Sequence, residues 1–419
     1  MSLAKNVDYL RGLPKLNGFA DFGRTLKPGQ RSPLVETKNF GSNPGALRMF
    51  TFAPDNLQPA PGLVVVLHGC GQSAAAYDLG AGWSTLAKHY GFALLMPQQQ
   101  PFNNANGCFN WFNPEDTARD SGEAGSIRQM IARAVRDIGI DRERIFVTGL
   151  SAGGAMTSVM LATYPEIFAG GAVIAGLPFG VASNVREALS GMFQSPARAA
   201  SELGDLVRSA SNHKGPWPKL SVWHGSADRT VNPANANEIV KQWLDVHQLP
   251  AAPMSEGTVN GYPRQVWWNA EGETIIESYT ITDMAHGTPL GIGDNDKRYG
   301  TQGAFLIEAG ISSSYQIANF FGLTEWIRRS KVAPAAASKK VVSTETPKKV
   351  ASLETSKEAA KAIPAVTPAP PSAPDLAQVL WPLTTLNRPA EPPPQEPKRR
   401  GIDVGSVITR ALTAAGLMK

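Results

Sequence analysis

A serine between two glycines stands at residues 149–153, where the sequence reads Gly-Leu-Ser-Ala-Gly. The run RIFVTG is typical of a buried strand, and GGAMTSVMLATYP after it is typical of a helix. A serine hydroxyl is a weak nucleophile unless a sharp turn exposes it beside a base, and G-x-S-x-G between strand and helix is such a turn. We therefore predict that Ser151 is a nucleophile for acyl transfer, with Gly149 and Gly153 leaving room where strand and helix approach. The alternative is a glycine-rich turn with an incidental serine.

An acid follows Ser151 in the chain order that this turn requires, which is serine, then carboxylate, then histidine. Asp228 lies in the loop after the strand-like run LSVWHG, and we predict that it orients the histidine and stabilises its charged form. Its alternative role is to cap a helix or close a turn. Asp245 and Asp283 are weaker candidates for the acid.

Six histidines compete for the role of base. His286 follows Asp228 in a loop just beyond the last predicted strand, and we predict that it accepts the serine proton. His68 and His224 each precede a glycine at a strand end, where a structural histidine bound to the backbone is expected. The remaining three fall near helix C-termini or in an insertion: His89, His247 and His213.

The loop after the run LVVVL reads His-Gly-Cys-Gly-Gln over residues 68–72. In an α/β sheet with this serine turn, that loop supplies a main-chain N–H to the negatively charged oxygen of the intermediate. We predict the N–H of Cys70 as one donor and the N–H of Ala152 as the other. This chemistry requires no metal and no organic cofactor, and the two cysteines lack the clustering of a zinc or iron–sulfur site.

These candidates lie at the ends of strand-like segments that alternate with helical patterns. Such alternation predicts an α/β fold, a mostly parallel sheet covered by helices on both faces, with ligands at the carboxyl ends of its strands. Residues 178–218 lack strand patterns and are predicted to form an insertion above the sheet. The predicted strands are 46–53, 63–69, 92–97, 144–149, 169–176 and 220–225, with a hairpin over 264–281, and the predicted helices are 77–91, 123–137, 153–163, 233–247 and 314–330.

Charge and composition divide the chain of 419 residues, whose formal net charge is +5. Residues 331–419 hold 13 basic and 7 acidic side chains and 13 of the 33 prolines, so residues 1–330 carry a net charge of −1. A neutral domain argues against a nucleic-acid partner. We predict an N-terminal extension over 1–44, a catalytic domain over 45–330, and a disordered Pro/Ala/Lys-rich tail over 331–419 with a short terminal helix.

Targeting signals are weak in this sequence. No window approaches the roughly 18 consecutive apolar residues of a membrane span, so no transmembrane segment is predicted. The first residues, MSLAKNVDYLRGLPKLNGF, lack the apolar stretch of a secretory signal peptide, so a cytoplasmic location stays open as an alternative.

Four separated motifs within about residues 45–325 resemble the poly(3-hydroxybutyrate) depolymerase family of esterases, which includes feruloyl and acetylxylan esterases. They read LHGCGQ, GCFNWFNPED, RIFVTGLSAGGAMTSVMLATYPEIFAGGAVIAGLPFG and VWHGSADRTVNP. The resemblance implies an α/β-hydrolase fold, Ser151, Asp228 and His286 as catalytic triad, and Cys70 and Ala152 as oxyanion donors. It also implies an extracellular location, because relatives are mostly exported.

The resemblance further implies a disulfide between Cys70 and Cys108, whereas the residues alone leave two buried thiols as the alternative. Many relatives have a tryptophan and a proline shortly after the catalytic histidine, but this chain reads His286-Gly287-Thr288-Pro289, which predicts a site without that aromatic wall. The tail contains no aromatic-rich binding module. We therefore expect hydrolysis of oligomers or small esters rather than erosion of crystalline polyester.

We predict a serine carboxylic-ester hydrolase that cleaves 3-hydroxyalkanoate oligomers, polyester or short-chain esters through an acyl-enzyme. The alternative substrates are feruloyl or acetyl esters of plant polysaccharides. The alternative from another class is a catalytically silent adaptor of a granule or envelope, with the basic tail contacting an anionic surface or granule. Four tryptophans are candidates for lining an apolar pocket: Trp111, Trp217, Trp267 and Trp268.

Overall fold

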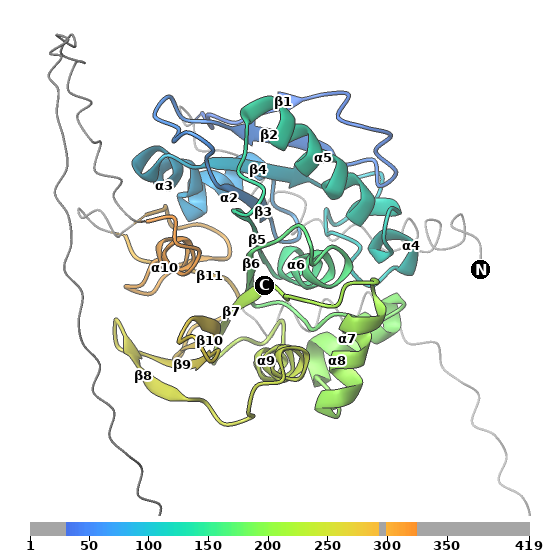
Figure 1. Cartoon of the computed structure of the whole chain (residues 1–419), viewed down its shortest axis with the longest axis vertical. Helices are drawn as coiled ribbons and strands as arrows, with labels where there is room; N and C mark the ends of the chain where they lie inside the picture. The colour runs from blue at the N-terminus through green and yellow to red at the C-terminus, as the bar shows by residue number, and fades with distance from the viewer. Residues whose placement is uncertain (1–30, 293–298, 325–419) are drawn as a thin grey trace, which may run out of the picture. The chain divides into compact units, whose positions relative to one another are not determined.

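The computed structural model describes residues 31–292 and 299–324. These residues form a ten-stranded sheet with helices on both faces (Figure 1), together with a small two-stranded sheet. The predicted tail over 331–419, its terminal helix and most of the predicted N-terminal extension lie outside the described residues. In the described part, no helix has both the length and the apolar character that crossing a bilayer requires.

The large sheet has the strand order β1-β2-β4-β3-β5-β6-β7-β10-β9-β8. Neighbours are parallel from β4 through β10 and antiparallel at both edges. The strands are β1 Val35–Thr37, β2 Arg48–Phe52, β3 Leu63–Leu67, β4 Ala93–Gln98, β5 Ile145–Leu150, β6 Gly170–Ile174, β7 Lys219–Gly225, β8 Ser255–Val259, β9 Tyr262–Trp268 and β10 Thr274–Ile281. Every residue of β3, β5 and β6 is buried, which is why these strands read as continuous apolar runs.

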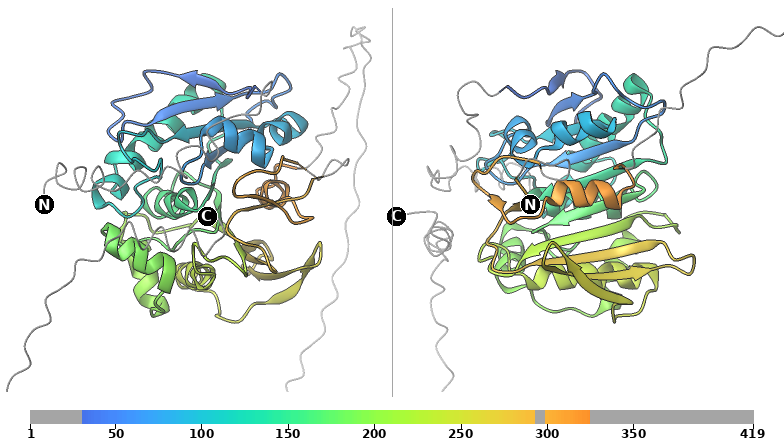
Figure 2. Two further views of the ribbon diagram at one scale, coloured as in Figure 1. Left: turned by 180° about the vertical axis from the view of Figure 1, so that it is seen from behind. Right: turned by 90° about the vertical axis from the view of Figure 1, so that its left-hand side faces the viewer.

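Two sets of helices cover the two faces of the sheet (Figures 1 and 2). One face carries α5 Gly122–Ile138, α6 Ala152–Thr163 and α9 Ala234–His247, and the other carries α2 Ala74–Ala81, α3 Trp83–Tyr90 and α10 Ser313–Phe320. The segment between β6 and β7 forms α7 Val185–Gln194 and α8 Ala200–Ser209, and α8 packs against α9. The remaining elements are α4 Pro114–Thr117 and the two strands of the small sheet, β11 Thr288–Leu290 and β12 Leu306–Glu308.

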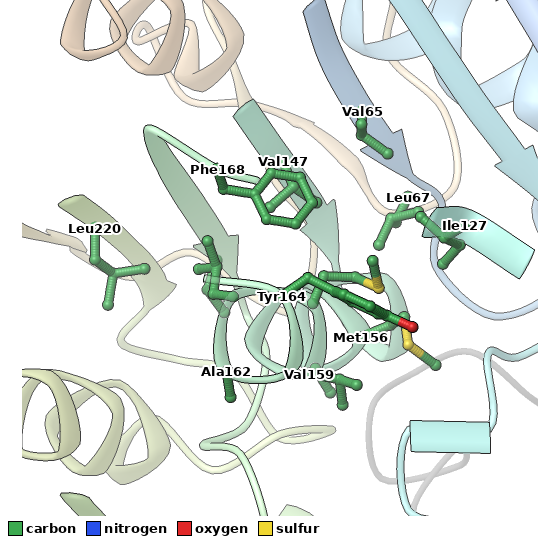
Figure 3. Packing of buried hydrophobic residues seen from close by; sticks show 14 of the residues in the cluster. Val65, Leu67, Ile127, Val147, Met156, Val159, Ala162, Tyr164, Phe168 and Leu220 are labelled. Atoms are coloured by element: carbon green, nitrogen blue, oxygen red, sulfur yellow. The ribbon is translucent and has the colours of Figure 1, made fainter. Parts of the chain in front are cut away.

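Helix α6 is buried along its whole length. Its side chains, among them Met156 and Val159, belong to the same core cluster as Val65, Leu67 and Val147 of the central strands (Figure 3). An apolar helix with no polar face is stable only when it is surrounded by protein. The start of α6, directly after Ser151, is therefore held rigidly against the sheet.

The helix predicted over 77–91 is two helices, because the chain breaks at Gly82. That residue has φ 78°, and a Cβ placed on it would lie 2.7 Å from the main-chain nitrogen of Gly300. Asp78 caps the second helix by accepting a hydrogen bond from Ser84 N–H at 2.7 Å. Gly82 therefore ends one helix and begins the next, although the apolar periodicity continues across it.

Element ends also differ from the predictions. Strand β1 pairs with β2, and Glu36 on it accepts two hydrogen bonds from Arg48, so the sheet begins before the domain boundary predicted at residue 45. Strand β8 adds an edge that no pattern indicated, because its side chains are mostly exposed. The closing helix, predicted to reach 330, ends at Phe320, and Gly322 follows with φ 71°.

Candidate active site

Ser151 forms the turn between β5 and α6 with a strained backbone. Its φ of 57° and ψ of −118° are rare for a residue with a side chain. Its N–H donates to Ile174 O at 2.9 Å, and its carbonyl accepts from Ala155 N–H at 2.8 Å. Strain of this kind persists only where the surrounding structure enforces it, and it is concentrated at functional sites.

The two glycines of the turn are required by close backbone contacts. A Cβ on Gly149 would lie 2.4 Å from the carbonyl group of Gly153. A Cβ on Gly153 would lie 2.3 Å from Leu67 O and 2.6 Å from His68 O, at the end of β3. The turn that presents Ser151 therefore touches the loop that begins at His68.

Asp228 and His286 are joined by a hydrogen bond of 2.7 Å between Oδ2 and Nδ1. Both side chains are buried, at 0% and 7% exposure. The other carboxylate oxygen of Asp228 accepts from the N–H groups of Thr230 and Val231 at 2.8 and 2.9 Å. Because Nδ1 donates to the carboxylate, Nε2 of His286 is the nitrogen that is able to accept a proton.

The loops that carry this pair are fastened to each other. Ala227 N–H donates to Met284 O at 3.0 Å, and a Cβ on Gly225 would lie 2.2 Å from that oxygen. Beyond His286, Thr288 Oγ1 is 3.0 Å from the hydroxyl of Tyr77 on α2, and both side chains are buried. The acid and the base, 58 residues apart in the sequence, are thus fixed by local contacts on both sides.

Asp228 is ionised in this environment. Burial raises the pKa of its carboxyl, but the charge of His286 and the hydrogen bonds from His224 and His286 outweigh burial and bring the pKa well below its usual range. A permanently charged carboxylate stabilises the imidazolium that forms when His286 takes up a proton.

Ser151 lies at the same carboxyl edge of the sheet as this pair, on β5, while Asp228 and His286 follow β7 and β10. Within the described residues, no hydrogen bond joins Ser151 Oγ to His286. In ligand-free enzymes such contacts are often long and tighten only when substrate binds. The structure therefore joins two of the three predicted residues directly and places the third on the same edge.

The loop after β3 is held by a disulfide between Cys70 and Cys108. Gly71 N–H also donates to Asn106 O at 2.9 Å. Neither Cys70 N–H nor Ala152 N–H has an acceptor in the part of the chain that the structure describes. Both are therefore available to a developing oxyanion.

A buried carboxylate that the sequence did not reveal supports the same loop. Glu123 on α5 is fully buried and accepts hydrogen bonds from the main-chain and side-chain nitrogens of Asn110, both at 2.8 Å. Gln99 donates to Glu123 and to Cys108 O, and its N–H donates to His68 Nε2 at 3.2 Å. Burial, with the nearby charge of Asp116, raises the pKa of Glu123 well above its usual range. In the sequence, Glu123 is an ordinary first-turn acid of a helix.

The weaker candidates have other roles. Asp245 pairs with Arg208 at 2.6 Å, and Asp283 is exposed. Burial lowers the pKa of His247 to about 4, so this imidazole is neutral rather than charged at the end of its helix.

The four candidate tryptophans differ in their exposure to solvent. Trp111 and Trp267 are buried in the core, Trp217 packs against it, and Trp268 is partly exposed on β9. Among the described residues, no cluster of three or more His, Cys, Asp or Glu side chains is placed to hold a metal ion.

Known proteins with similar sequences include esterases and a depolymerase. The family described as Esterase PHB depolymerase matches residues 50–255. Poly(3-hydroxyalkanoate) depolymerase C of Paucimonas lemoignei is 46% identical over 291 residues, covering 69% of this chain and 70% of that protein. An acetylxylan esterase of Coprinopsis cinerea is 35% identical, covering 61% of this chain and 69% of the relative.

Among solved structures, an acetyl xylan esterase from Aspergillus awamori superposes with a TM-score of 0.59 at 25% identity, covering 69% of this chain and 99% of that one. The fold and the family predicted from the sequence are confirmed. The chain belongs to the Esterase PHB depolymerase family and is a carboxylic-ester hydrolase with an α/β-hydrolase fold.

Proposed function

We propose that Ser151, His286 and Asp228 are the catalytic triad of this esterase, with the N–H groups of Cys70 and Ala152 as its oxyanion donors. The observation that carries the proposal is the 2.7 Å hydrogen bond between His286 and the buried Asp228, at the sheet edge where Ser151 occupies its strained turn. In the described residues, the one further aspartate–histidine contact at that edge involves the same acid, Asp228, and His224.

The reaction follows from this geometry. Ser151 Oγ attacks the ester carbonyl carbon while its proton passes to His286 Nε2, and the oxyanion accepts hydrogen bonds from the two main-chain N–H groups. The intermediate collapses, the bond to the alcohol oxygen breaks, and His286 gives its proton to the leaving alcohol. Water then loses a proton to His286 and attacks the acyl carbon. The bond between that carbon and Ser151 Oγ breaks, His286 returns the proton to Oγ, and the carboxylic acid is released.

For the substrate, we propose 3-hydroxyalkanoate esters, as oligomers or polyester. The support is the 46% identity to a protein named as a poly(3-hydroxyalkanoate) depolymerase. Acetyl or feruloyl esters of plant polysaccharides are the second candidate, favoured by the similarity to acetylxylan esterases. We do not propose the silent adaptor, because the relatives are esterases; a contact of the tail with an anionic surface stays a prediction.

For the location, we propose the extracellular space. The support is the disulfide between Cys70 and Cys108, because disulfides persist in oxidising environments and are rare in the cytosol.

The experiment that tests the triad is the variant Ser151→Ala, assayed on short-chain nitrophenyl esters. We expect turnover to fall by about 10⁶-fold, since triad serines contribute on that order. Circular dichroism should match that of the wild type, because the methyl group of alanine fits where the serine was. Turnover above about one part in 10⁴ of the wild-type value would overturn the assignment.

The substrate class is tested by comparing the purified wild-type protein on 3-hydroxybutyrate oligomers, acetylated xylan and a ferulate ester. Release of 3-hydroxybutyrate with the highest kcat/KM supports the first candidate. Preferential release of acetate or ferulate replaces it with the second.

A further inference from the structure

Asp228 is in contact with two histidines rather than one. Besides His286, the ring of His224 places Nε2 at 3.2 Å from Asp228 Oδ2, the same oxygen that His286 contacts. His224 lies near the end of β7, is 3% exposed, and pairs in the sheet with Thr280 of β10. It is therefore fixed to the sheet core while its ring faces the acid.

The hydrogen-bond partners of His224 define which of its ring nitrogens donates. Nε2 also lies 3.0 Å from Val231 O, so both neighbours of this nitrogen are acceptors and Nε2 carries a hydrogen. Nδ1 is buried and has no partner among the described residues. His224 therefore donates through Nε2, the nitrogen that faces the acid.

The same contacts close a small ring around the acid. His224 Nε2 reaches Val231 O, and Val231 N–H donates at 2.9 Å to Asp228 Oδ1. The turn over residues 228–231 is thus tied to β7 through one imidazole. The titratable groups that face the Asp228 carboxylate are His224 from β7 and His286 from the loop after β10.

We propose that His224 is a positioning residue of the catalytic triad, which holds Oδ2 of Asp228 toward Nδ1 of His286 and donates a hydrogen bond to the carboxylate. The proposal rests on the proposed function, because it gives His224 a role only through the triad. It also assigns a function to His224, whose position before a glycine at a strand end predicts only a structural role.

Two consequences follow from removing the donor. The Asp228 side chain loses one constraint on its rotation, so the orientation of His286 is less well defined and kcat falls. Asp228 also loses one of the groups that stabilise its negative charge, so its carboxylate interacts more strongly with the imidazolium of His286. The second effect is electrostatic, and a purely structural histidine would not produce it.

The test compares His224→Leu, which removes the donor at similar volume, with His224→Gln, whose amide nitrogen reaches the position of Nε2. We expect His224→Leu to lower kcat by about tenfold to a hundredfold, the range for losing a hydrogen bond to a charged group. We also expect the acidic limb of its kcat/KM profile to move to higher pH. His224→Gln should restore most of kcat and the original limb.

His247→Leu is the matched control, because His247 is partly buried at the far end of α9 and its Nε2 also contacts a carbonyl, Pro218 O at 3.1 Å. We expect this variant to keep the wild-type pH profile. If His224→Leu does not fold, His224→Asn replaces it, since its amide is one methylene too short to reach Asp228. Ser151→Ala, measured in parallel, shows whether the triad itself is correctly assigned.

Three results would overturn the proposal if Ser151→Ala is inactive. The first is a kcat of His224→Leu within threefold of wild type. The second is a loss of kcat in His224→Leu without a shift of the acidic limb, and the third is a loss of kcat that His224→Gln does not restore. An active Ser151→Ala would instead overturn the proposed function.

Discussion

Adding one methyl group at Gly153 should damage both stability and turnover. In an ordinary helix, replacing glycine by alanine stabilises by about 1 kcal/mol. Here the new Cβ would lie 2.3 Å from Leu67 O, and ordinary contact begins at 3.4 Å, so α6 and the end of β3 must separate by about 1.1 Å. Overpacking of this kind typically costs about 1–3 kcal/mol, so the sign of the effect is reversed.

The same displacement separates Ser151 from the oxyanion loop, because Leu67 and His68 lead directly into Cys70. A misplacement of about 1 Å is able to lower turnover by about a hundredfold. We expect Gly153→Ala to show both effects in urea unfolding and in kcat on nitrophenyl butyrate. The control is Gly257→Ala on β8, where a Cβ meets nothing within 4 Å. If Gly153→Ala matches this control in stability and kcat, the prediction that a Cβ at residue 153 clashes with the end of β3 is wrong.

Two further predictions concern stability. Replacing both Cys70 and Cys108 by serine should lower the free energy of unfolding by about 4 kcal/mol, because the disulfide closes a loop of 38 residues. Urea unfolding of the oxidised wild type and of the variant measures this loss. A difference below about 1 kcal/mol would contradict the prediction. Burial raises the pKa of Asp78 to about 6, so its carboxyl binds a proton more tightly in the folded protein than in the unfolded one. Raising the pH from 4 to 7 should therefore destabilise the wild type relative to Asp78→Asn by up to about 3 kcal/mol. Asn keeps the oxygen that accepts Ser84 N–H, and an unchanged difference between the two proteins across this range would refute the burial effect.

The parts of the site that were predictable depend on local sequence. Gly149, Ser151 and Gly153 belong to one strand–turn–helix unit, and the buried strand before it and the helix after it are both readable as apolar runs. Asp228 and His286 were selected by chain order and by their places after predicted strands. Their contact depends on how the loops after β7 and β10 meet, which the sequence indicated only indirectly.

The parts that were missed depend on tertiary contacts or on weak patterns. Glu123 reads as a helix-start acid, and only the fold shows that the loop around Asn110 closes over it. His224 reads as a strand-end histidine, and its contact with Asp228 arises because the chain turns back within four residues. Strand β8 escaped because an edge strand exposed on both sides needs no apolar alternation.

The identity of the nucleophile is tested most directly by covalent labelling. The purified wild-type protein is treated with a fluorophosphonate, which reacts with activated serines, and the modified residue is located by mass spectrometry. We expect one adduct per chain, on Ser151, with labelling abolished in Ser151→Ala and strongly slowed in His286→Ala. An adduct on another residue, or full ester hydrolysis after Ser151 has been labelled, would contradict the assignment of Ser151 as the nucleophile.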